Sequence, residues 1–219
     1  MKRVCLILTI VFAVLSVALL AADLPAWQKY RKGDIKDFNT VAAGELKEGD
    51  LVKGYIEVTE GSIAERQETK KHFGITTSKS TTMQYYAVYM DNGQCILYGT
   101  SKSDEYAQLD KLGRDWTYFF KMMDVNPEEL TESDRPTARI PFTARVNKMS
   151  KDLNSIFSSW WGENYNTECE TNVIMTYARF EGFQTTVFIG FGLAAGAVLM
   201  LILFIVTVIK GKKAPQYTY

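Results

Sequence analysis

The chain has 219 residues and a formal net charge of zero, from 25 basic and 25 acidic side chains. The charges are unevenly distributed, because residues 23–182 carry 20 basic and 25 acidic side chains, a net charge of −5. Nucleic-acid binding depends on clustered basic residues, so this composition argues against a nucleic-acid partner. It also argues against a central region that lies flat on an anionic membrane surface.

An apolar stretch of 19 residues, 4–22, follows a short basic tip. At about 1.5 Å per residue it spans roughly 28 Å, close to the thickness of a hydrocarbon core. Two interpretations are open: a signal anchor that stays in the membrane, or a signal peptide that is removed. Cleavage after Ala21 or Ala22 places a leucine where the cleavage pattern needs a small residue. We therefore expect an uncleaved transmembrane helix.

Strands dominate the first half of the region that follows. Residues 51–58, LVKGYIEV, are rich in β-forming side chains and predict a strand. Residues 62–69 predict a second, more polar strand. Residues 70–82 are rich in serine and threonine and are expected to form a solvated loop or hairpin tip.

The clearest local pattern is a hairpin. Residues 83–90 and 94–99 are apolar and aromatic, and they flank the turn sequence Asp91-Asn92-Gly93. An Asn-Gly pair between two such runs predicts a tight turn, because both central positions favour positive φ.

Two amphipathic helices are predicted further along the chain. Apolar residues recur at three- and four-residue steps over residues 104–124, which predicts a helix with one buried face. A second apolar stripe covers residues 151–161 and ends on Trp160 and Trp161. The spacing places Trp160 in the core and leaves Trp161 at the edge of the stripe, as a candidate ligand contact.

Residues 139–147 and 172–180 complete the pattern as two further predicted strands, the latter with a turn into the membrane as its alternative. Strands therefore precede and surround two helices. This order predicts an α+β fold over residues 23–182, with an antiparallel sheet and two amphipathic helices between two transmembrane helices.

The second membrane-spanning segment is predicted at residues 183–209. Its core, residues 187–209, holds 23 consecutive uncharged residues and spans roughly 34 Å as a helix. Lipid offers the backbone no hydrogen-bond partners, so only a helix is viable there. Gly192 and Gly196 form a GxxxG pair, a candidate packing face for the first span or for a second copy of the chain.

Both ends of the chain are basic, with Lys2 and Arg3 at one end and three lysines in the tail 210–219. Positively charged flanks stay in the cytoplasm. We therefore expect a two-pass protein of the cell membrane, with both termini cytoplasmic and residues 23–182 outside.

Cys95 and Cys169 both fall in this central region. In an oxidising compartment they are a candidate disulfide, and two buried free thiols are the alternative.

Motifs of catalysis, cofactor binding and metal binding are lacking in the sequence. His72 is the single histidine and lies beside two lysines, which argues against metal sites and against a Ser-His-Asp triad. Three adjacent Ser-Lys pairs fit loops and helix caps better than a catalytic dyad: Ser78-Lys79, Ser101-Lys102 and Ser150-Lys151. The acidic run at residues 126–136 is expected to be a solvated surface, without the residue order of a calcium loop.

The order of segments is a basic tip, a span, a β-rich region whose first strand reads G-D-L-V-K-G-Y-I, a second span and a basic tail. This layout resembles uncharacterised bacterial two-span membrane proteins with an extracytoplasmic β-rich domain. The resemblance implies architecture and no activity.

We expect a non-catalytic, membrane-anchored binding or assembly module, whose partners are the bilayer and either a membrane protein or a second copy of the chain. The alternative is an envelope hydrolase, with a carboxylate or Ser/Lys site that only the fold assembles.

Overall fold

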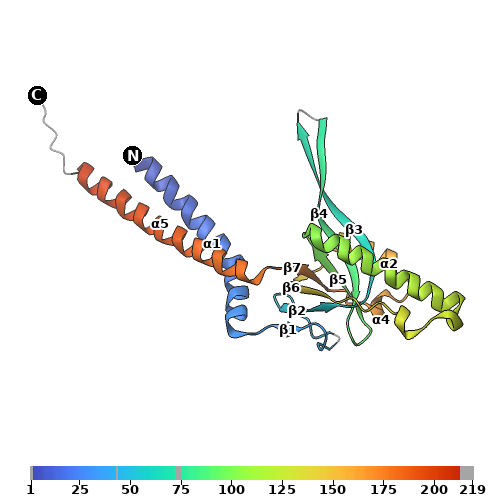
Figure 1. Ribbon diagram of the computed structural model, residues 1–219. Coiled ribbons are helices and arrows are strands. Elements are labelled where there is room, and N and C mark those ends of the chain that lie inside the picture. Colours follow the sequence, from blue (N-terminus) through green and yellow to red (C-terminus); the bar gives the residue numbers. More distant parts are fainter. Residues whose placement is uncertain (1, 43, 73–74, 213–219) are drawn as a thin grey trace, which may run out of the picture. The chain divides into compact units, whose positions relative to one another are not determined.

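The computed structural model describes residues 2–42, 44–72 and 75–212. The chain forms two compact units (Figure 1). A helical unit combines helix α1, Lys2–Lys32, with helix α5, Phe180–Lys212. A central unit comprises Asp34–Arg179.

The helices α1 and α5 run antiparallel and pack along their length (Figure 1). Each contains a 30-residue segment that is long and apolar enough to cross a membrane. The buried positions of α5 include Phe183, Val187, Gly190 and Ala197, which follow steps of four, three and seven residues. This heptad spacing is the one that keeps a narrow seam facing a partner helix. The remaining faces are exposed and apolar, as lipid contact requires.

The seam between α1 and α5 depends on close contact at one glycine. A Cβ atom on Gly190 would lie 2.8 Å from Leu20 Cδ2, so any side chain there collides with α1. At the same level the buried hydroxyl of Ser16 donates a 2.8 Å hydrogen bond to the Gly190 carbonyl. The hydroxyl therefore has a partner inside a segment that is apolar enough to cross a membrane.

The central unit is built on a seven-stranded sheet with the order β1-β2-β6-β7-β5-β4-β3. The strands are β1 Lys36–Asp37, β2 Leu51–Ile56, β3 Thr59–His72, β4 Ile75–Tyr89, β5 Cys95–Thr100, β6 Ile140–Lys148 and β7 Val173–Tyr177.

The sheet is mixed, so the prediction of an antiparallel sheet is wrong in this respect. Strands β1 and β2 are parallel, as are β5 and β7, while the other neighbours are antiparallel. The long connection after β5 contains helices and β6, and it returns the chain to the end where β5 began. Strand β7 then enters between β5 and β6 in the direction of β5. Strand periodicity carries no information about direction, which is why the sequence could not reveal this pairing.

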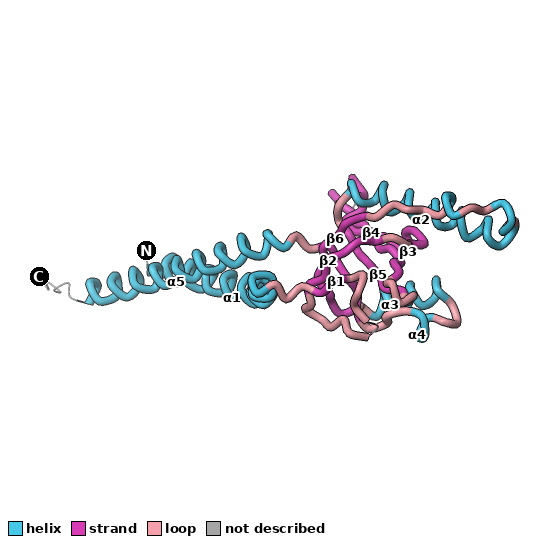
Figure 2. The backbone as a smooth tube through the Cα atoms, turned by 60° about the horizontal axis from the view of Figure 1, so that its bottom comes forward, coloured by secondary structure: helices cyan, strands magenta, loops and turns pink. Residues whose placement is uncertain are grey.

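Helices cover both faces of the sheet (Figure 2). Helix α2, Ser103–Val125, lies on one face, and helices α3, Lys151–Trp161, and α4, Tyr165–Glu168, lie on the other. Strand β5 is buried on both sides because its side chains alternate between the two cores. Ile96 and Tyr98 belong to the core under α2, whereas Cys95 and Leu97 belong to the core under α3.

The predicted hairpin and both predicted helices are confirmed. The Met90 N–H donates to the Gln94 carbonyl at 2.9 Å, and Gly93 has a φ of 82°. The cap of α3 is also confirmed, since the Ser150 hydroxyl accepts from the Leu153 N–H at 3.3 Å.

The Ser/Thr-rich segment after residue 70 forms a hairpin, which is one of the two predicted alternatives. Strand β3 continues to His72 and β4 begins at Ile75, so much of the Ser/Thr-rich segment is strand. Threonine is β-branched and suits an exposed strand, and each strand satisfies the backbone of the other. A polar composition therefore does not distinguish a loop from a polar hairpin.

Candidate functional site

The second half of α2 continues beyond the strands of the sheet (Figures 1 and 2). There it lines an open apolar groove of about 550 Å³, together with the turns that follow it. We call this the aromatic groove, and its lining includes Trp116, Phe119, Phe120, Met123, Pro127, Leu130 and Arg135.

The first half of α2 is fixed to the sheet by a buried carboxylate. Glu105 is 5% exposed, and its carboxylate accepts hydrogen bonds from Tyr98 Oη at 2.9 Å and Thr100 Oγ1 at 2.7 Å. Lys102 Nζ lies 2.9 Å from the same carboxylate and forms an ion pair with it, so the buried charge of Glu105 is balanced. This network fastens the first turn of the helix to β5 and so sets its direction.

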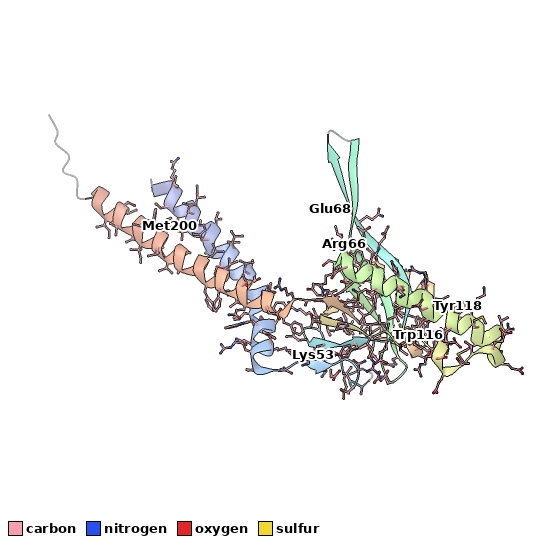
Figure 3. The ribbon with its side chains drawn as sticks, viewed as in Figure 1. Lys53, Arg66, Glu68, Trp116, Tyr118 and Met200 are labelled. Atoms are coloured by element: carbon pink, nitrogen blue, oxygen red, sulfur yellow. The ribbon has the colours of Figure 1, made fainter. Side chains whose placement is uncertain are left out.

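Near its middle, α2 touches the backbone of β3. A Cβ atom on Gly113 would lie 2.7 Å from the Gly61 Cα atom, so the helix passes the strand with no side chain between them. One turn later Trp116 Nε1 donates to the Glu57 carbonyl at 2.6 Å. Trp116 is the last fully covered residue of the helix, and Tyr118 projects from a different side of it (Figure 3).

Beyond Trp116 the apolar stripe of α2 is only partly covered. Phe119 and Phe120 pack on the Trp116 ring with centroid distances of 5.6 and 5.2 Å. Phe120 nevertheless remains 40% exposed and Met123 49% exposed. Contiguous exposed apolar side chains of this kind mark binding surfaces in soluble domains.

The surroundings of the aromatic groove are acidic. Five carboxylates lie between residues 124 and 134, against Lys121 before them and Arg135 after them. The Thr131 hydroxyl and backbone N–H both donate to Asp134, which holds the pKa of that carboxyl below its ordinary value. The Arg135 guanidinium lies 5.7 Å from the centroid of the Trp116 ring. The groove lining itself holds one acid, Glu132, and one cation, Arg135, and the other four carboxylates lie in the same segment of the chain. An apolar groove in an acidic segment favours ligands that combine apolar and basic groups.

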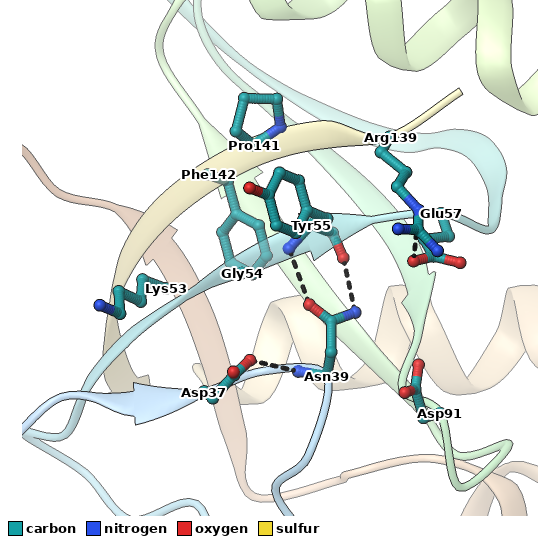
Figure 4. A pocket seen from close by; sticks show the side chains of 10 residues that line it. All are labelled: Asp37, Asn39, Lys53, Gly54, Tyr55, Glu57, Asp91, Arg139, Pro141 and Phe142. Atoms are coloured by element: carbon teal, nitrogen blue, oxygen red, sulfur yellow. Dashed lines mark hydrogen bonds and ion pairs between the residues drawn. The ribbon is translucent and has the colours of Figure 1, made fainter. Parts of the chain in front are cut away.

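A second groove, polar and about 570 Å³ in volume, lies at the β1 edge of the sheet (Figure 4). The side chain of Asn39 substitutes for a strand residue at this edge. Its Nδ2 donates to the Tyr55 carbonyl at 3.0 Å, and its Oδ1 accepts from the Tyr55 N–H at 2.9 Å. Gly54 permits the approach, because a Cβ atom there would lie 2.7 Å from Asn39 Oδ1. Because these two bonds occupy the backbone groups of Tyr55, another strand cannot pair with β2 at this position.

Three carboxylates line this polar groove, from Asp37, Glu57 and Asp91. Glu57 forms a 3.0 Å ion pair with Arg139, and Asp37 accepts the Asn39 N–H at 3.0 Å. Two of the three acids therefore stabilise this edge of the sheet, which is a structural role.

The two tryptophans at the end of α3 differ in exposure from the sequence prediction. Trp160 is 41% exposed, so its placement in the core is wrong. Trp161 packs against Phe157 and Tyr89 instead, and its Nε1 donates to Glu168 at 3.0 Å. The apolar stripe of α3 is wider than the face that the sheet covers. Trp161 is thus held within the structure, and its role as a ligand contact remains a prediction.

Cys95 and Cys169 lie opposite each other as a parallel bridge pair, and the structure holds both as buried free thiols, so their disulfide remains a prediction. Burial raises the pKa of the Cys95 thiol, with hydrogen-bond contact to Cys169 as the next cause. The structure brings the two predicted partners together although 73 residues separate them in the sequence.

The Ser-Lys pairs do not assemble a dyad among the described side chains. Lys102 is bonded to Glu105, and Ser150 caps α3. Ser78, Lys79 and the side chain of His72 fall outside the described side chains.

The two glycines of the GxxxG pair face different directions. A Cβ atom on Gly196 would lie 3.2 Å from the Phe12 ring, so Gly196 faces α1. A Cβ atom on Gly192 would meet nothing within 4 Å. Gly190, two residues earlier, makes the closer contact with α1.

Leucine substitutions should distinguish the face of α5 that contacts α1 from the face that does not. We expect Gly190→Leu to break the α1–α5 seam, since its side chain must displace Leu20 and the Ser16 bond. Gly192→Leu should leave the seam intact. Disulfide cross-linking of cysteines introduced at Phe12 and Gly196 measures the seam. Equal loss of cross-linking in both variants would contradict this assignment.

Comparison with known proteins found no matching family model, no matching curated protein and no matching solved structure. The geometry of the described residues is therefore the basis for the function proposed below.

Proposed function

We propose that the chain is a membrane-anchored binding module without catalytic activity, and that the aromatic groove of α2 holds its partner. The observation that carries the proposal is the only partly covered apolar half of α2, which is fixed rigidly by its first half. Aromatic side chains in such a setting supply most of the energy of a protein contact.

The partner that fits is an amphipathic helix with apolar and basic faces. A helix of this kind places its apolar face in a groove and anchors it at steps of three and four residues. The acidic rim at residues 124–134 complements lysine and arginine on the flanks of the helix. Rim charges of this kind mainly accelerate association and make it sensitive to salt.

We also propose that the two apolar helices anchor the module in a membrane. Two helices that are able to cross a bilayer flank the central unit in sequence. The basic tips favour an arrangement with both termini in the cytoplasm and the central unit outside. The module then acts on partners in or near the same membrane, as a second copy or a different protein.

Binding of designed peptides tests the groove. The full chain in neutral detergent is titrated with two labelled helical peptides of identical apolar pattern, one with lysine and one with glutamate on the polar face. We expect the lysine peptide to bind at least tenfold more tightly, because only it complements the rim. Phe120→Ala with Met123→Ala should weaken its binding at least tenfold.

A matched control comes from α3, where Ile156 and Trp160 are also exposed apolar residues. Ile156→Ala with Trp160→Ala should leave peptide affinity unchanged. The assignment fails if both pairs of substitutions weaken binding equally, or if the glutamate peptide binds as well as the lysine peptide.

The hydrolase alternative is supported by the three carboxylates of the polar groove alone. Their ion pair with Arg139 and their bond to Asn39 suit a closed sheet edge better than acid–base work. We therefore favour the binding module.

A further inference from the structure

The last two turns of α1 carry a small hollow of about 430 Å³. It is lined by Trp27, Gln28, Arg31 and Lys32, all from the same helix. The Arg31 guanidinium lies over the Trp27 ring, 5.0 Å from its centroid. The hollow thus combines an aromatic wall, an amide and two cations.

The position of this hollow relative to the bilayer follows from the apolar segments of both helices. Trp27 packs against Phe188 with ring centroids 6.2 Å apart, and Phe188 is the second residue of the uncharged run of α5. On α1, Trp27 comes five residues after the apolar stretch ends at Ala22, about 7.5 Å along the helix. With both helices crossing the bilayer, Trp27 lies in the headgroup layer, where tryptophan is enriched.

The direction of the side chains brings the cations to the same layer. Side chains of an α-helix tilt toward its N-terminus, which for the end of α1 is the direction of the membrane. Arg31 follows this rule, since its guanidinium reaches back one turn to Trp27. A guanidinium binds phosphate oxygens in pairs, and a neighbouring ammonium adds a second charge.

The charges near this end are net positive. At this end of the helical unit, residues 23–33 and 180–182 carry three cations, Lys29, Arg31 and Lys32, and two acids, Asp23 and Glu181. Their net charge is +1. The central unit, with 17 basic and 23 acidic residues, has a net charge of −6 and repels anionic surfaces. Attraction to anionic lipid is therefore confined to the helical unit.

We propose that this hollow binds the phosphate of an anionic phospholipid, with Arg31 and Lys32 on the phosphate oxygens, Gln28 donating to them, and Trp27 against the glycerol and upper acyl chain. The site needs the two spans but does not need the aromatic groove, so either assignment stands if the other fails. The bound lipid fixes the depth of α1 in the membrane.

Lipid retention tests the site. The full chain, delipidated in neutral detergent, is titrated with phosphatidylglycerol or phosphatidylcholine, and bound lipid is counted by native mass spectrometry. We expect phosphatidylglycerol to bind at least tenfold more tightly. Arg31→Gln with Lys32→Gln should abolish that preference. Trp27→Ala should weaken phosphatidylglycerol binding.

The control variant removes the same number of positive charges from a different helix. Lys111→Gln with Arg114→Gln changes two exposed cations on α2 and should leave lipid binding unchanged. Equal retention of both lipids, or equal effects of the two double variants, overturns the proposal. Displacement of the lipid by millimolar inorganic phosphate would instead assign the site to free phosphate and overturn the lipid as its ligand.

Discussion

Joint replacement of Cys95 and Cys169 by alanine should lower the free energy of unfolding by about 4 kcal/mol when the protein is isolated from its membrane under non-reducing conditions. The two residues already face each other across a parallel bridge, and both are buried thiols in the structure. Neighbouring strands lie about 4.8 Å apart, within reach of the separations that disulfides span. A bond between them closes a loop of about 75 residues, for which loop-closure entropy predicts a stabilisation of this size.

The redox chemistry depends on the proposed topology. An oxidising compartment removes two protons and two electrons from the pair and passes the electrons to a dithiol–disulfide oxidoreductase. Because burial raises the pKa of the Cys95 thiol, the reactive thiolate is scarce in the folded unit. The bond should therefore form before the core under α3 closes.

Thiol counting provides the measurement. Alkylation after unfolding without reductant should label one cysteine, Cys5, of the three in the chain, and all three after reduction. A Cys5→Ser variant is the control and should then show no labelling without reductant. Labelling of all three thiols in protein taken directly from the membrane would contradict the disulfide and assign Cys95 and Cys169 as two buried free thiols.

The elements of this fold follow from the sequence more readily than their arrangement does. The Asn-Gly turn and the helix over residues 104–124 depend on local chemistry, so the sequence predicts them correctly. The parallel pairing of β5 with β7 depends on a connection that spans helices and a strand, and no local pattern encodes it. The Ser/Thr-rich segment after residue 70 shows the same limit, because solvated loops and exposed hairpins share a composition.

The candidate site shows why spacing alone is incomplete. Phe120 and Met123 belong to the apolar stripe that predicts a buried helix face, yet the sheet ends before the stripe does. Periodicity reveals that a face is apolar and does not reveal what covers it. Trp160 on α3 is exposed for the same reason. The asymmetry between Gly190 and Gly192 likewise depends on which side of α5 meets α1, which only the packed pair defines.

Gly113→Ala should lower the free energy of unfolding by about 2 kcal/mol, although alanine ordinarily stabilises a helix relative to glycine by about 1 kcal/mol. The sign reverses because the new methyl group would lie 2.7 Å from Gly61 Cα and 2.8 Å from Gly61 N. These are backbone atoms of β3, so no side-chain rotation relieves the contact, and overpacking of this kind costs about 1–3 kcal/mol. Urea unfolding of the full chain in detergent, followed by tryptophan fluorescence, measures the change.

Gly113→Ala should also weaken peptide binding, because the contact between α2 and β3 sets the position of the aromatic groove. To relieve the contact, α2 must move away from β3 and stretch the bond from Trp116 Nε1 to the Glu57 carbonyl, now 2.6 Å long. Trp116 forms the floor of the aromatic groove, so the groove changes shape with it. Arg114→Ala, at the exposed neighbouring position, should change stability by less than about 0.5 kcal/mol and leave binding intact. A gain of stability in Gly113→Ala would show that helix and strand are not in contact there, and that α2 is free to pivot.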